Sequence, residues 1–202
     1  MIDPVSLGLL MAIGAGGAAA VSRWRRKGAE RVDARRAADG RADAKPAEAQ
    51  PAPAPPTGAY QVDDVLLFLG EEFWLAGQLA VMREGTATLM LYPAPERGRD
   101  RWMAAPRQGD ALYVLEVDAT LARLGWPGAE VPDRGATLRR SEEGACTFVP
   151  TGEVPDGWSG GGRYAVFRSL DTVAVFVEQG ANHLALRGKT VPRRLVERLR
   201  GS

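Results

Sequence analysis

Between residues 60 and 200 the chain consists of short apolar runs separated by glycine, proline and aspartate, and this spacing restricts the fold more than any other feature. Runs of about four to eight residues bounded by turn residues are typical of β-strands. The predicted strands are 65–69, 73–83, 86–92, 101–104, 111–117, 137–140, 145–149, 164–169, 172–178 and 183–187. The sequence therefore predicts a mainly β domain.

The apolar pattern of segment 172–178 indicates how the strands are arranged. Three valines at positions 173, 175 and 177 alternate with Ala174 and Phe176, so both faces of this strand are expected to be covered. Coverage on both faces favours a β-sandwich or a barrel-like domain over an open sheet.

Local signals give further expectations along this domain. Glu84-Gly85 is typical of a hairpin turn between two strands. Segment 73–82 also fits helical spacing, and we interpret it as a strand. A short C-terminal helix is predicted to begin at Pro192. Its apolar stripe would be Leu195, Val196 and Leu199, with Arg193, Arg194, Arg198 and Arg200 facing outward.

Residues 4–22 form an uncharged, mostly apolar stretch that is followed at once by Arg23, Arg25, Arg26 and Lys27. A helix of this length spans the roughly 30 Å hydrocarbon core of a bilayer. The basic flank predicts a single-pass anchor in a bacterial inner membrane, with the N-terminus outside and the domain in the cytoplasm. A cleaved signal peptide is the alternative, but it would carry its positive charge before the apolar region.

Small residues recur every four positions within this stretch, which would place them on one face of a helix. Such a face allows close approach of a second helix, from another copy of the chain or from a membrane partner. An alanine- and glycine-rich composition also produces this spacing by chance. The residues are Gly8, Ala12, Gly16 and Ala20.

Three regions follow from this division of the chain: an anchor with its basic flank at 1–27, a linker at 28–59 and the β-rich domain at 60–202. The linker has almost no large apolar side chains, so it cannot bury enough surface to offset its ordering entropy. Its first part is predicted to be disordered or a helical stalk, and its proline-rich second part an extended spacer.

Three stretches of the domain carry a family resemblance: GEEFWLAGQLAVM, ATLMLYPAPERGRDRWMAAPRQGDALYVLE and GRYAVFRSLDTVAVFVEQGANHLALRGKTV. Together they cover most of residues 63–191, and their layout resembles a bacterial family catalogued only as a domain of unknown function, number four-one-seven-eight. The resemblance implies a β-rich domain without an established activity. Members of that family are often membrane-tethered or encoded near membrane-stress and polyamine-related genes, which is an association and not a mechanism. The resemblance implies no functional residues. This chain departs from the family at Met103 and in a polar insertion around residues 127–135.

The inventory of reactive residues favours a non-enzymatic domain. His183 is the only histidine and Cys146 the only cysteine, and no nucleophile motif accompanies them. We expect no catalytic residue, no metal site and no cofactor. Lys and Arg nearly balance Asp and Glu (26 against 25), and no aromatic side chains are interleaved with the C-terminal arginines, so nucleic-acid binding is not expected.

Two segments are candidate contact surfaces. The loop from Trp158 to Arg163 offers an aromatic anchor and a charge, both common in interface hot spots. The C-terminal arginines Arg193, Arg194 and Arg198 would face an acidic partner or anionic lipid, and a solvated helix face is the alternative.

The leading hypothesis is a membrane-tethered adaptor that binds a protein partner, with a role in envelope stress. The alternative is a β-domain that binds a small ligand or a lipid headgroup, polyamine-related, inside a barrel.

Overall fold

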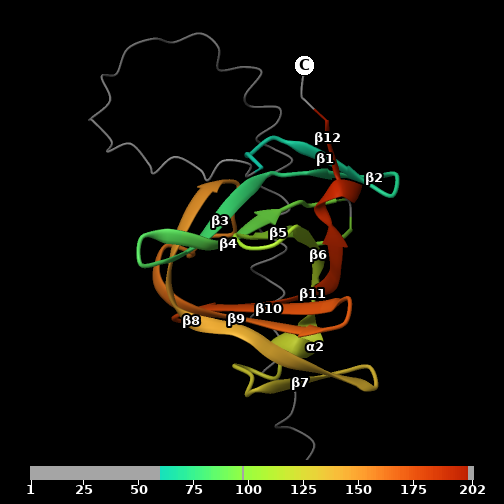
Figure 1. Ribbon diagram of the computed structural model, residues 1–202. Coiled ribbons are helices and arrows are strands. Elements are labelled where there is room, and N and C mark those ends of the chain that lie inside the picture. Colours follow the sequence, from blue (N-terminus) through green and yellow to red (C-terminus); the bar gives the residue numbers. More distant parts are fainter. Residues whose placement is uncertain (1–59, 97, 200–202) are drawn as a thin grey trace, which may run out of the picture. The chain divides into compact units, whose positions relative to one another are not determined.

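The computed structural model describes residues 60–96 and 98–199, which form two antiparallel sheets (Figure 1). A small sheet has the strand order β12-β1-β2, and a large sheet has the order β3-β4-β5-β6-β11-β10-β9-β8-β7. The elements are β1 (Val65–Phe68), β2 (Glu71–Trp74), β3 (Gly77–Arg83), β4 (Thr86–Pro93), β5 (Arg101–Pro106), β6 (Ala111–Val117), α2 (Ala119–Ala122), β7 (Glu130–Asp133), β8 (Ala136–Gly152), β9 (Gly160–Ser169), β10 (Thr172–Gln179), β11 (Asn182–Pro192), the 3-10 turn η2 (Arg193–Leu195) and β12 (Glu197–Leu199).

The large sheet closes on itself. β3 pairs with the second half of β8, from Gly77 opposite Gly152 to Met82 opposite Thr147. This pairing joins eight strands into a closed barrel, while β7 pairs only with the first half of β8 and lies outside the ring. Of the two predicted architectures, the barrel is therefore the one that forms.

The interior of the barrel is filled with side chains. Leu79 and Val81 of β3 form one cluster with inward residues from all the remaining strands of the ring. The loop between β8 and β9 adds Trp158, whose ring packs edge-on against Phe148 at 5.3 Å between centroids. The full interior cluster is Leu79, Val81, Leu89, Leu91, Trp102, Ala104, Tyr113, Leu115, Cys146, Phe148, Trp158, Tyr164, Val166, Val173, Val175, Val177 and Leu186.

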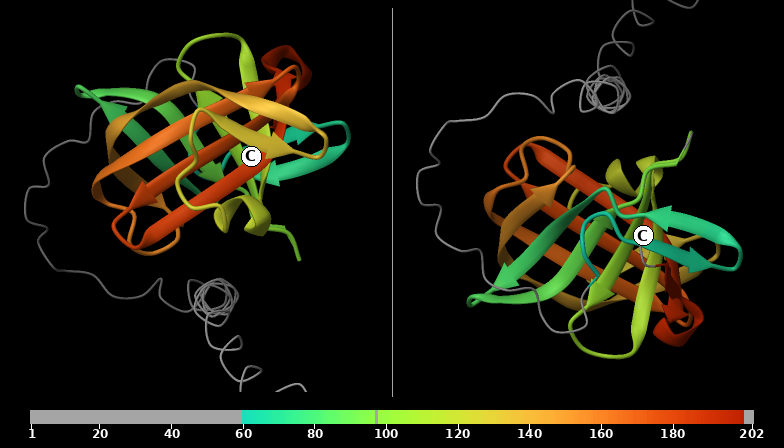
Figure 2. Two further views of the ribbon diagram at one scale, coloured as in Figure 1. Left: turned by 90° about the horizontal axis from the view of Figure 1, so that it is seen from below. Right: turned by 90° about the horizontal axis from the view of Figure 1, so that it is seen from above.

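Apolar clusters also lie on two outer sides of the barrel. Figure 2 shows the elements that cover these sides, which are the small sheet and the segment of α2 and β7. On one side the inner face of the small sheet, with Leu66 and Phe73, covers residues of β3 to β6. On the other side Leu121 of α2 and Val131 of β7 cover residues of β9, β10 and β11. Both coverings follow from the alternation of side chains along a strand, which leaves every second apolar residue outside the ring.

Strand β10 shows this double coverage as the sequence predicts. Its three valines belong to the barrel interior, whereas Ala174 and Phe176 belong to the outer cluster with α2 and β7. The Glu84-Gly85 hairpin is also confirmed, and both residues have positive φ angles, 50° and 74°. Segment 73–82 is strand, but a break at Leu75 and Ala76 divides it between β2 and β3.

The predicted C-terminal helix is wrong. After Pro192 the chain makes only the short turn η2 and then enters strand β12, which pairs with β1 from Leu199 opposite Val65 to Glu197 opposite Leu67. The free edge of β1 supplies backbone partners that a helix would leave unused. Val196 also packs against the cluster beneath the small sheet, and its branched side chain suits an extended backbone.

The predictions for the N-terminal part fall outside the described residues. They are the membrane anchor at 4–22 within 1–27, its small-residue face of Gly8, Ala12, Gly16 and Ala20, and the linker at 28–59. Among the residues that the structure describes, no helix has the length and apolar character needed to cross a membrane.

Two neighbouring glycines of β9 provide a test of interior packing. A Cβ on Gly162 would lie 2.4 Å from the backbone oxygen of Glu178 and 2.4 Å from the Phe148 ring, whereas a Cβ on Gly161 would meet nothing within 4 Å. We expect Gly162→Ala to lower the free energy of unfolding by about 2 kcal/mol or more, as overpacking does. Gly161→Ala should change it by less than about 0.5 kcal/mol. Urea-induced unfolding of both variants measures the difference, and equal stabilities would contradict the inward placement of Gly162.

Candidate interaction surface

The sequence predicts Trp158 as an aromatic anchor on the surface, and this prediction is wrong. Its side chain is 6% exposed and belongs to the barrel interior. The loop that carries it folds over one end of the barrel, and the strand β9 begins at Gly160, so most of the segment 158–163 is strand rather than loop. An indole that fills the end of an apolar core cannot at the same time fill a pocket on a partner.

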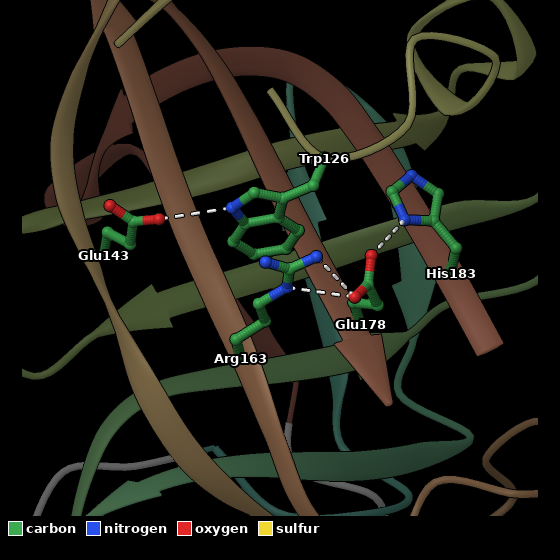
Figure 3. A network of polar contacts seen from close by, with 5 residues as sticks. All are labelled: Trp126, Glu143, Arg163, Glu178 and His183. Carbon is green, nitrogen blue, oxygen red and sulfur yellow. Dashed lines mark hydrogen bonds and ion pairs between the residues drawn. The ribbon is translucent and has the colours of Figure 1, made fainter. Parts of the chain in front are cut away.

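Arg163 lies on the outer surface of β9, where other side chains already engage its guanidinium (Figure 3). The guanidinium lies 4.1 Å from the centre of the Trp126 ring. It also donates to Glu178 Oε1, at 2.9 Å from Nε and 2.6 Å from Nη2. Because the stack and the ion pair together fix this side chain, Arg163 attaches the segment after α2 to the barrel.

The same network extends to both sides of Arg163 (Figure 3). Trp126 donates its Nε1 hydrogen to Glu143 at 3.2 Å, and Glu143 pairs with Arg140 at 2.6 Å. On the other side Nδ1 of His183 lies 3.6 Å from Glu178 Oε2. The sequence does not predict a role for Trp126, because only the fold brings it next to Arg163 of β9 and Glu143 of β8.

The C-terminal arginines do not form the shared basic face that a helix would have presented. The guanidinium of Arg193 lies over the ring of Tyr60, at 5.9 Å from its centre. Arg198 pairs with Asp64 at 2.7 Å. Arg194 is exposed on the turn η2. Two of the three predicted contact residues therefore have partners within the domain.

A row of exposed apolar side chains lies on the side of the small sheet that faces away from the barrel. Leu66 and Phe73 point toward the barrel, so their neighbours in sequence point away from it. The register aligns Leu199, Val65 and Trp74 in one row across the three strands. A second row consists of Glu197, Leu67 and Glu72. We call these six residues the outer face.

Exposure confirms this arrangement. Trp74 is 42% exposed and Leu199 is 38% exposed, while Val65 and Leu67 between them are half-buried. None of these four side chains belongs to an apolar cluster of the described residues. The sequence contained a usable signal, because Phe73 and Trp74 are adjacent in a strand and must point to opposite sides.

A buried arginine fastens the small sheet to the barrel. The side chain of Arg101 on β5 is 4% exposed and pairs with both Glu71 of β2 and Glu96. Its guanidinium also lies 4.0 Å from the centre of the Phe73 ring. Both carboxylates are about half exposed, but the guanidinium that they neutralise is buried, and a buried charge without its partner is strongly unfavourable. The position of β2, and with it Trp74, therefore depends on Arg101.

A groove and two buried titratable side chains lie outside the outer face in the described residues. A shallow groove of about 390 Å³ is lined by Met82, Arg83, Glu84, Ala145, Cys146 and Thr147. Cys146 has a neighbouring cation in Arg83, yet burial raises the pKa of its thiol to about 11. Burial also raises the pKa of Tyr164, which donates a hydrogen bond to Glu142. No group of three or more metal-binding side chains occurs in the part of the chain that the structure describes.

In comparisons with known proteins, no family model, no curated protein and no solved structure matches the chain. The family resemblance seen in the sequence therefore stays a prediction.

The single cysteine gives a test of the interior that uses the whole chain. Raising a thiol pKa from 9.0 to about 11 lowers the thiolate fraction about 100-fold at pH below both values. We expect alkylation of Cys146 by iodoacetamide at pH 8 to be at least that much slower in the native protein than in urea. The native rate should keep rising with pH up to about 11. A native rate equal to the unfolded rate would contradict the burial of this thiol.

Proposed function

We propose that the β-domain is a non-enzymatic adaptor module that binds a protein partner through the outer face of the small sheet. The observation that carries the proposal is the row of Leu199, Val65 and Trp74, which belongs to none of the apolar clusters formed by the described residues. A contiguous apolar row with an exposed indole is costly to leave in water and is typical of protein interfaces.

The shape of this surface supports a protein over a small molecule. Small-molecule sites are concave and bury most of their ligand, whereas the outer face is one side of a three-stranded sheet. The barrel interior, where the alternative hypothesis places a small ligand, is occupied by the side chains of the interior cluster. The alternative therefore has less support from the geometry than the adaptor.

The location of the module is part of the proposal. The apolar stretch at 4–22 and its basic flank support a single-pass anchor in a bacterial inner membrane, with the domain in the cytoplasm. The first described residue, Tyr60, packs in the cluster beneath the small sheet. The chain therefore enters the domain beside the sheet that presents the outer face.

Site-specific photo-crosslinking in the native cell tests this function. A photoreactive residue replaces Trp74 in the full-length chain, and a matched chain carries it at Leu170, which is 100% exposed on the β9–β10 turn. We expect a discrete protein adduct from position 74 and none from position 170. The adduct should be lost when Val65→Ser and Leu199→Ser are added, because both residues form the same row. Equal adducts from both positions, or none from position 74, would overturn the proposal.

A further inference from the structure

The second row of the outer face carries charge at both ends. Register places Glu197 and Glu72 on either side of Leu67, one on each outer strand of the small sheet. Neighbouring strands lie about 4.8 Å apart, so the backbones of the two glutamates are roughly 10 Å apart. Two carboxylates therefore flank an apolar centre.

Neither carboxylate has an ion pair or a hydrogen bond to another described residue, although other acids nearby do. Glu71 pairs with the buried Arg101, and Asp64 pairs with Arg198. The nearby cation Arg193 stacks on Tyr60. Both glutamates are exposed, so their charges remain available to a molecule that covers the sheet.

This charge pattern discriminates between occupants of the face. A second copy of the chain would bring four unpaired carboxylates together, and like charges oppose such a contact. An anionic lipid surface would meet the same two carboxylates and be repelled. A cationic segment would pair with both of them while its apolar residues cover Trp74, Val65 and Leu67.

We propose that the occupant of the outer face is a segment of a partner protein in which an apolar anchor stands between two basic side chains, Lys or Arg. Glu72 and Glu197 are the specificity-determining residues, and Trp74 is the apolar contact. This inference rests on the proposed function, because it names the chemistry of the partner that the adaptor binds.

The test uses two fluorescent peptide probes and the full-length protein in detergent micelles. The first probe contains Lys-Leu-Trp-Leu-Lys, and the second replaces both lysines by glutamate. We expect fluorescence anisotropy to show binding of the lysine probe, weakened by added salt, and no binding of the glutamate probe. Glu72→Gln with Glu197→Gln should weaken binding of the lysine probe about tenfold, since two exposed ion pairs are lost together.

A matched control and a charge reversal protect the result from unfolding artefacts. The control is Glu84→Gln with Glu153→Gln, two exposed acids outside the small sheet, and it should leave the affinity unchanged. Reversal by Glu72→Lys with Glu197→Lys should transfer the preference to the glutamate probe, which an unfolded chain would not do.

Equal binding of the two probes, or an unchanged affinity in the double Gln variant, would overturn the charge assignment. Failure of this inference is distinguishable from failure of the proposed function. A partner that docks on Trp74 without basic residues still gives the crosslink at position 74, whereas a face without any partner gives none.

Discussion

The pairing of β3 with the second half of β8 is the constraint on which the rest of the structure depends. Without it the large sheet would have two free edges and one continuous exposed apolar side. With it, inward residues from strands far apart in sequence, such as Leu79 and Phe148, meet in one interior. The apolar residues that remain outside then require two further coverings, which the small sheet and the α2–β7 segment provide.

A barrel filled in this way has consequences for function. Side chains as large as Trp102, Trp158 and Tyr164 occupy the interior, so binding is directed to the outside of the domain. The small sheet is covered on one side only, and its second side becomes the outer face. The buried Arg101 links the barrel to the small sheet. Its contacts hold β2 against the barrel and thereby also set where Trp74 lies.

The sequence predicts those parts of this fold that depend on local patterns. Alternation in β10 and the Glu84-Gly85 turn depend on neighbouring residues, and both expectations are met. Features that depend on distant partners were missed. The residues after Pro192 have helical spacing, but the free edge of β1 draws them into β12. Trp158 follows glycines and polar residues typical of a loop, and only the open end of the barrel explains its burial. The candidate surface was missed for the same reason, since pairing of β12 with β1 assembles its rows.

Hydroxyl-radical footprinting of the full-length protein, in its native cell and after purification, tests the central claim most directly. The account predicts that Trp74 is modified readily in the purified protein and is protected in the cell, while the fully exposed Leu170 is modified equally in both. The buried Trp102 and Trp158 should remain protected throughout. Equal modification of Trp74 in the two settings would contradict the claim that the outer face is a partner surface.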